Sequence, residues 1–146
     1  MKIKFHTRNT IGSLLSSKNP TPDKFSVSGV NKLTCPDCHK AYVRQTGRCF
    51  ATRFKEHEAA FRNNCHTSNF AKHLNEEAHS IGPIHSIMQV LHYHRKGAHL
   101  NTLEIFHIHA DSAANNHLND NHKILPNAIF DTLARKKSSH KKPSTP

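Results

Sequence analysis

The sequence predicts a small α+β domain in which a three-stranded, mainly antiparallel sheet is flanked by helices. Two short apolar segments, 29–34 and 41–45, are separated by the turn-forming residues CPDCHK, a pattern typical of two paired strands. Phenylalanines then recur at helical spacing, and a partly alternating apolar segment follows at 84–93. The order of two strands, helices, one strand and a last helix favours the α+β class.

The two helices after the strand pair are predicted from spacing and capping. Phe50, Phe54 and Phe61 share one helical face among charged residues, which predicts an amphipathic helix over about 47–63. Ser68 is a suitable N-cap for a second helix, which begins directly after it.

We expect the chain to form one domain, because 146 residues leave room for a single modest core. The residues Ile-Gly-Pro at 81–83 form a turn ahead of the third strand, and the final helix is expected to begin near Asn101. We expect a polar N-terminal segment and linker over 1–28, one folded domain over 29–130, and a basic, disordered tail over 131–146.

The chain is strongly basic, with a formal net charge of +11 and a sequence pI near 9.8. This excess favours a polyanionic partner such as nucleic acid, bound through phosphate neutralisation and counterion release; the alternative is a basic protein without a particular partner. No apolar run approaches the roughly 20 residues that span a bilayer, and the N-terminus lacks the apolar core of a secretory signal. We therefore expect an intracellular, nuclear protein whose four cysteines are metal ligands or free thiols.

Cys35 and Cys38 have the two-residue gap of a zinc knuckle. Thirty-four residues separate Cys38 from His73, whereas the gap in a compact zinc finger is about a dozen residues. A Zn²⁺ ion held by these cysteines with His73 and His79 would join the strand turn to the end of the second helix. Positions six apart on an ideal helix are rotated by about 600°, so His79 must lie beyond the helix end. Two alternatives remain, a site made of all four cysteines and no bound metal.

Short motifs occur on these predicted elements in a defined order. Gly29–Asn31 lies on the first strand and Tyr42–Arg44 on the second, and the following helix carries Arg53 and, four residues later, His57. This arrangement resembles the GIY-YIG endonuclease domain, most closely the form attached to Penelope-like retroelements, which has a similar Cys-Cys-His-His set. The resemblance covers about residues 29–130.

The resemblance implies hydrolysis of DNA phosphodiesters with one divalent cation, Mg²⁺ or Mn²⁺, beside a structural Zn²⁺. It assigns the catalytic roles to Tyr42, Arg53, His57, Glu104 and Asn119. Arg53 and His57 are four residues apart, so they project from one helix face toward a shared target. A guanidinium offsets charge on a phosphate without losing its proton. The alternative for Arg53 is a solvated helix arginine.

Glu104 is the residue that the resemblance assigns to the divalent cation. It is the only acid between Glu77 and Asp111, which suits one Mg²⁺ ion completed by phosphate and water. The alternative is a capping box, because Asn101 precedes Glu104 by three residues.

Tyr42 would, by the same resemblance, orient the attacking water, and Asn119 would be a polar group near the cation. Their alternatives are a core tyrosine on a strand and a turn residue in an Asn-rich segment.

Basic residues around these motifs suit phosphate contacts: Lys40, Arg44, Arg48, Lys55 and Arg62. Two positions depart from the family, because Asn31 stands in place of its first tyrosine and Arg44 in place of its second glycine. Asparagine cannot relay a proton as a phenol does, and arginine fills space that glycine leaves open. Two interpretations remain. The first is a retroelement-derived DNA endonuclease with weakened activity. The second is a non-catalytic protein, either a zinc-stabilised nucleic-acid-binding module or an inactive retroelement remnant.

Overall fold

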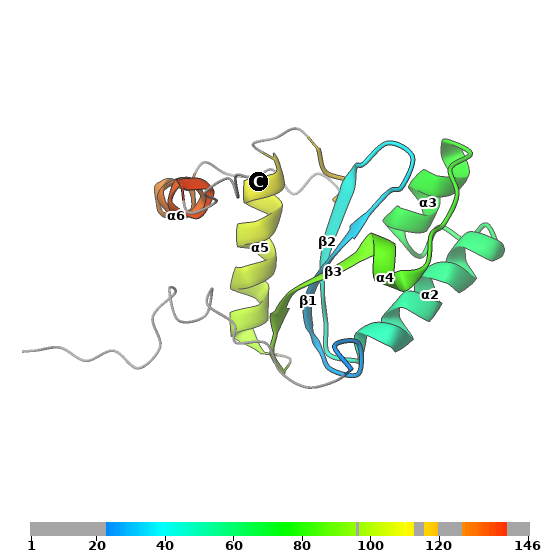
Figure 1. Cartoon of the computed structure of the whole chain (residues 1–146), viewed down its shortest axis with the longest axis horizontal. Helices are drawn as coiled ribbons and strands as arrows, with labels where there is room; N and C mark the ends of the chain where they lie inside the picture. The colour runs from blue at the N-terminus through cyan, green and yellow to red at the C-terminus, as the bar shows by residue number, and fades with distance from the viewer. Residues whose placement is uncertain (1–22, 96, 113–115, 120–126, 140–146) are drawn as a thin grey trace, which may run out of the picture.

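The computed structural model describes residues 23–95, 97–112, 116–119 and 127–139. Its elements are β1 (Gly29–Thr34), β2 (Ala41–Thr46), α2 (Phe50–Arg62), α3 (Asn69–Glu76), α4 (Ile84–Ile87), β3 (Met88–Tyr93), α5 (Ala98–Ser112) and α6 (Ala128–Ser139). The strands form one antiparallel sheet in the order β2-β1-β3, which confirms the predicted α+β class (Figure 1). Of the predicted N-terminal segment 1–28, residues 1–22 lie outside the described residues.

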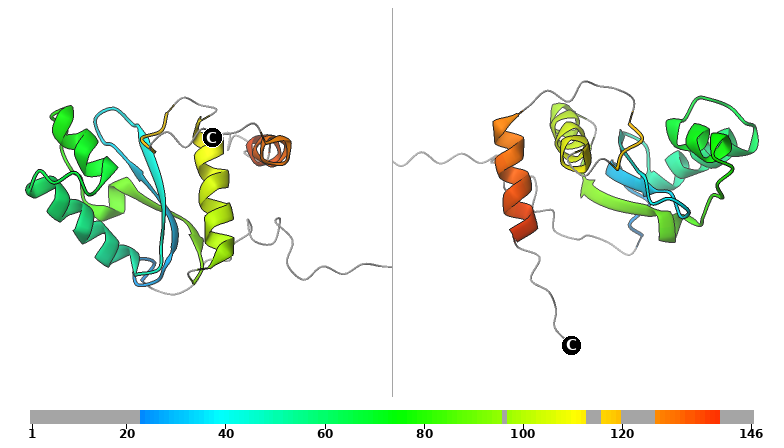
Figure 2. Two further views of the ribbon diagram at one scale, coloured as in Figure 1. Left: turned by 180° about the vertical axis from the view of Figure 1, so that it is seen from behind. Right: turned by 90° about the horizontal axis from the view of Figure 1, so that it is seen from above.

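Helices cover both faces of the sheet: α2 and α3 lie on one side and α5 on the other, with α6 beyond α5 (Figures 1 and 2). Alternation along the strands divides the apolar side chains between the two faces. Leu33 and Tyr42 join the phenylalanines of α2 and α3 in the larger core. Val30 and Val43 face the other way and pack with leucines of α5. The result is one central sheet with a separate apolar layer on each side.

The helices on the first face agree with the sequence. α2 covers Phe50–Arg62, inside the predicted range, and buries Phe50 and Phe54. Ser68 is the N-cap of α3, and its hydroxyl accepts from the Ala71 amide at 3.2 Å, which confirms the predicted cap.

The third strand begins later than predicted. Residues 84–93 were expected to be extended throughout, but Ile84–Ile87 form the short helix α4 and the strand starts at Met88. The Pro83 carbonyl accepts from the amides of Ser86 and Ile87, at 3.0 and 3.3 Å. These local bonds make a helical turn where the apolar pattern alone indicated a strand.

Helix α5 begins at Ala98, three residues before the predicted start near Asn101. The Leu100 amide bonds to the Gly97 carbonyl at 3.0 Å, so the helical turn is already formed at this point. Asn101 is therefore inside the helix, and its side chain accepts from Gln45 instead of capping. The capping-box interpretation of Glu104 is wrong for this reason.

Part of the predicted disordered tail is helical, because residues 131–139 belong to α6. The Asn127 side chain caps this helix by accepting from the amides of Ile129 and Phe130 at 3.1 and 3.2 Å. Phe130 packs edge-to-face on Phe106 of α5, with ring centroids 5.6 Å apart. The cap and this aromatic contact stabilise a helix in a segment whose basic composition alone predicts disorder. Residues 140–146 lie outside the described residues.

Candidate functional site

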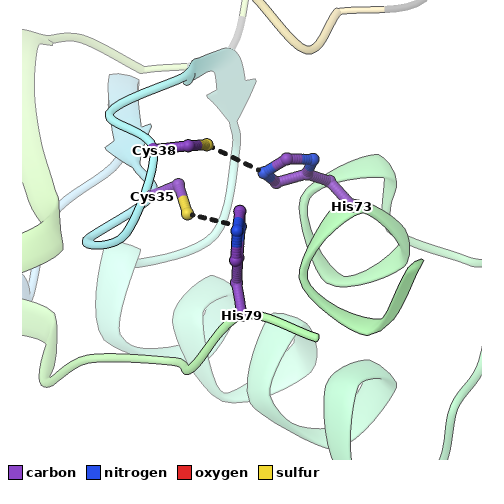
Figure 3. A group of neighbouring side chains, drawn as sticks. All are labelled: Cys35, Cys38, His73 and His79. Atoms are coloured by element: carbon purple, nitrogen blue, oxygen red, sulfur yellow. Dashed lines mark hydrogen bonds between the residues drawn. The ribbon is translucent and has the colours of Figure 1, made fainter. Parts of the chain in front are cut away.

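Four side chains that come from distant parts of the sequence meet at one end of the sheet. The ligand atoms of Cys35, Cys38, His73 and His79 all lie within 4.8 Å of one another (Figure 3). Cys35 Sγ is 3.3 Å from His79 Nδ1, and Cys38 Sγ is 3.2 Å from His73 Nε2. In a tetrahedral Zn²⁺ site, sulfur and nitrogen ligands lie about 3.5 Å apart. This group could therefore hold a metal ion with little rearrangement, and its donor set suits zinc.

The two cysteines are positioned by the turn between β1 and β2. The Cys35 amide donates to the Lys40 carbonyl at 2.9 Å, and the Cys35 carbonyl accepts from His39 at 3.0 Å. His39 has a φ of 60°, which lets the turn close tightly. Asp37 then bonds the Ser80 amide at 2.9 Å and thereby fastens the turn to the segment after α3.

The two histidines are brought together by the end of α3. The helix ends at Glu76, and Ala78 adopts a left-handed conformation with φ of 54°. The His79 amide then bonds back to the Leu74 carbonyl at 2.8 Å. This reversal confirms that His79 lies beyond the helix end, and it places the imidazole beside that of His73, with ring centroids 5.2 Å apart.

Burial shifts the pKa values of two groups in the cluster, one toward the form that binds metal and one away from it. Burial, and next the nearby His79, lower the pKa of His73, so its imidazole is neutral, as a ligand must be. Burial raises the pKa of the Cys35 thiol, and a bound cation would oppose that effect. The other two cysteines are not part of the group: Cys49 Sγ lies 2.9 Å from the Thr52 hydroxyl, and Cys65 is exposed. The four-cysteine alternative is therefore not formed.

A second group of polar side chains surrounds a cavity of about 680 Å³ at the end of β2. We call it the arginine pocket, and its lining consists of Arg44, Gln45, Thr46, Gly47, Arg48, Arg53, Gly97, Asn101 and Glu104. The lining comes from the second half of β2, from the loop after it and the first turn of α2, and from Gly97 with the first half of α5. The end of β2 and the starts of α2 and α5 lie at the same end of the molecule (Figure 1). Two of the predicted catalytic residues, Arg53 and Glu104, thus line the same cavity.

The pocket opens where the edge of β2 is no longer covered. β2 is an edge strand, and the segment that follows α5 covers its first half. The Asn119 side chain completes this cover: Val43 N donates to its Oδ1 at 3.0 Å, and its Nδ2 donates to the Val43 carbonyl at 2.6 Å. The next outward amide, that of Gln45, donates to Glu104 Oε1 at 3.4 Å. Asn119 therefore lies beside the strand, at the border of the pocket, and is absent from its lining.

Glu104 is held by donors of the neighbouring strand. It is only 9% exposed, and its Oε2 accepts from Gln45 Nε2 at 2.8 Å. Its Oε1 lies 3.6 Å from Arg44 Nη1. The carboxylate is thus buried and paired at the wall of the cavity.

The two arginines of the opposite wall are linked by one acid. Glu56 on α2 accepts from Arg48 with Oε1 and from Arg53 with Oε2. The hydrogen bond from Arg53 is the main reason that the pKa of Glu56 is lowered. This bridge orients the Arg53 guanidinium, whose side chain is 25% exposed at the pocket rim.

His57 and Tyr42 lie in the core and not in the pocket lining. His57 is 1% exposed, and its Nδ1 lies 2.6 Å from the Ser68 hydroxyl. Burial, and to a smaller extent the charge of Arg53, lower the pKa of His57 to about 4. The Tyr42 ring contacts the rings of both His57 and Phe70, at centroid distances of 6.0 and 6.5 Å.

The remaining predicted basic residues are on the surface outside the pocket. Lys40 is exposed in the turn between the first two strands, and Lys55 and Arg62 are exposed on α2. Arg62 lies 3.9 Å from Glu58 on the same helix. Asn31, which replaces the family tyrosine, is fully buried, and its amide atoms have no hydrogen-bond partner in the part of the chain that the structure describes.

The pocket residues that the sequence does not identify include Gln45 and Asn101, whose side chains bond each other beside Glu104. Gln45 is two residues after Val43, so strand alternation directs it to the α5 face. Asn101 is three residues before Glu104, and the two share a helix face. The sequence contains both spacings. They identify Gln45 and Asn101 as neighbours of Glu104 only when the start of α5 and the pairing of the strands are known.

No protein-family model, curated protein or solved structure matches this chain. Within the described ranges, no helix combines the length and apolar character required to cross a lipid bilayer.

Proposed function

We propose that this chain is a DNA endonuclease domain of the GIY-YIG type, derived from a retroelement, in which the arginine pocket binds the scissile phosphodiester. The observation that carries the proposal is the convergence of Arg53 and Glu104 on one cavity from opposite sides of the sheet. The order of elements that carried the resemblance supports it as well, because the strand motifs and the first helix occur in the expected sequence.

The arginine pocket has the charge and shape to hold a phosphate group. Three guanidiniums, from Arg44, Arg48 and Arg53, line a cavity that contains one carboxylate, Glu104. Guanidiniums bind phosphate oxygens in a bidentate manner and stay charged at all working pH values. Arg53, fixed by Glu56, would stabilise the negative charge that develops on the phosphate during hydrolysis.

The proposed divalent cation, Mg²⁺ or Mn²⁺, would be held by Glu104 together with the oxygens of the bound phosphate. Such ions often use one or two carboxylates plus substrate phosphates, so a single acid on the pocket wall is a compatible donor set. When bound, the cation would offset charge on the phosphate and activate a water molecule. Gln45 would orient the Glu104 carboxylate through the 2.8 Å bond to Oε2.

A second candidate function, DNA binding without hydrolysis, is favoured by a specific observation. Neither Tyr42 nor His57 lines the cavity, and both are packed in the larger core. In this alternative the zinc-stabilised domain uses the same arginines for phosphate contacts, and no group in the pocket activates water.

The two functions are separated by nicking of supercoiled plasmid DNA with Mg²⁺, using wild type, Glu104→Gln and Asp111→Asn. Asp111 is a matched control because it lies on the same helix but pairs with Lys32, at 2.8 Å, outside the pocket. The endonuclease proposal expects Mg²⁺-dependent nicking that falls by about a hundredfold or more in Glu104→Gln and is unchanged in Asp111→Asn.

Each outcome decides between the candidates. Nicking that is equal in wild type and Glu104→Gln would remove Glu104 from the mechanism. If wild type binds DNA but does not nick it, the second candidate is supported. If wild type neither binds nor nicks DNA, both candidates are wrong.

A further inference from the structure

Both carboxylate oxygens of Glu104 already face donors of the chain itself. Oε2 accepts from the Gln45 side chain at 2.8 Å, and Oε1 lies 3.4 Å from the Gln45 amide. Oε1 also lies 3.6 Å from Nη1 of Arg44. A cation that approached Glu104 from the pocket would compete with these donors for the two carboxylate oxygens.

Arg44 supplies the one full positive charge among these donors. It lies on the edge strand β2, and its side chain is 46% exposed, while that of Glu104 is 11% exposed. The guanidinium is a permanent cation, and at 3.6 Å it neutralises part of the charge that a metal ion would use. A second cation beside it is repelled.

The arginines of the pocket are paired with acids without a metal ion, and one of these acids, Glu56, lies outside the lining. Glu56 accepts hydrogen bonds from Arg48 and Arg53, and Glu104 is paired with Arg44. Three guanidiniums thus stand against two carboxylates. The excess of one positive charge attracts an anion to the pocket in the absence of a divalent ion.

We infer that Arg44 is the resident cation of Glu104 and competes with divalent metal ions for this carboxylate. The pocket therefore binds divalent ions weakly and binds a phosphodiester without needing them. The inference deepens the proposed function and rests on it for the role of Glu104. Arg44 acts here as a residue that determines which cation occupies the site.

The test measures Mn²⁺ binding to the zinc-loaded protein in the absence of DNA, from the electron paramagnetic resonance signal of the free ion. Wild type is compared with Arg44→Gln, which removes the charge at an exposed position of the strand. The double variant Arg44→Gln/Glu104→Gln tests whether the gained site uses Glu104. Arg62→Gln is the matched control, because it also removes an arginine that lies within 4 Å of a glutamate, at 3.9 Å from Glu58. Zinc content and circular dichroism verify that each variant is folded.

Arg44→Gln is expected to bind Mn²⁺ about fivefold more tightly than wild type. Mn²⁺ must displace Arg44 from Glu104 in the wild type, and the ion pair between them accounts for a factor of about this size. The gain is expected to disappear in the double variant and to be absent in Arg62→Gln. Equal Mn²⁺ affinity of Arg44→Gln and wild type would overturn the inference, and so would the lack of a saturable site in both. A gain that survives in the double variant would also overturn it, because Glu104 would not be the ligand.

This measurement is independent of the proposed function because it contains no DNA. Failure of plasmid nicking leaves the Mn²⁺ comparison intact, and an unchanged Mn²⁺ affinity leaves the nicking result intact.

Discussion

The pH dependence of stability should report the burial of His57. This imidazole is 1% exposed, in contact with Ser68 and with the rings of Tyr42 and Phe70. Burial, followed by the charge of Arg53, lowers its pKa from 6.5 to about 4. At neutral pH the side chain is therefore a neutral core residue in the folded protein.

The magnitude follows from the difference between the two pKa values. Below pH 6.5 the unfolded chain takes up a proton at His57, while the folded protein stays unprotonated until about pH 4. The free energy of unfolding therefore falls as the pH falls through this interval, and His57 has no effect above it. A fall through about 2.5 pH units corresponds to about 3 kcal/mol.

The assay is urea unfolding of wild type and His57→Asn at several pH values between 7.5 and 4. Asparagine has no titratable group and can keep a hydrogen bond to Ser68, which lies 2.6 Å from Nδ1. Protonation of the Cys and His cluster affects both proteins equally and cancels in the comparison. The wild type is expected to lose about 3 kcal/mol more than His57→Asn between pH 6.5 and 4. Parallel pH profiles would refute the argument that His57 is neutral and buried.

Three further predictions concern the metal cluster and the backbone. His79→Ala should lower the bound zinc from one ion per chain to near none, while Cys65→Ser keeps it, as measured by elemental analysis; equal loss in both would contradict the ligand set. Asn119→Ala should lower the free energy of unfolding by about 2 kcal/mol, because it removes two buried bonds to β2; an unchanged value in urea would contradict the edge-covering role. Gly29→Ala should destabilise by about 3 kcal/mol, because Gly29 has φ of 154° and a Cβ would overlap the His92 carbonyl; a stable variant would contradict that packing.

The fold class was predictable because apolar periodicity determines which segments become strands and helices. The strand pair 29–34 and 41–45, and the helix of Phe50 and Phe54, follow directly from this pattern. The predictions differ from the structure at the ends of the elements, because hydrogen bonds of single residues determine where a helix or strand begins. The Pro83 carbonyl closes a helical turn ahead of β3, and the Gly97 carbonyl starts α5 earlier than the apolar pattern indicates.

The metal cluster was more predictable than the arginine pocket. The spacing of Cys35 and Cys38 and the helix end before His79 restrict the ligand geometry, so few arrangements are possible. The contact between Arg44 and Glu104 instead depends on how α5 packs against the edge of β2, which local sequence does not determine. The positions of Arg53 and His57 on one helix face predict a shared target, but only Arg53 lines the pocket. This difference also depends on how the elements pack, so local sequence does not reveal it.

The most direct test of the account is the DNA affinity of Arg53→Gln compared with Arg62→Gln, measured over a range of salt concentrations. Both variants remove one charge from α2, and the sequence predicts both residues as phosphate contacts. Arg53 lines the arginine pocket, whereas Arg62 lies outside the lining and is exposed in the last turn of the helix, so the pocket argues against its predicted role. Arg53→Gln is expected to weaken binding about tenfold and to reduce the salt dependence by about one phosphate contact, with Arg62→Gln close to wild type. Equal weakening by the two variants would contradict the claim that DNA binds at this pocket.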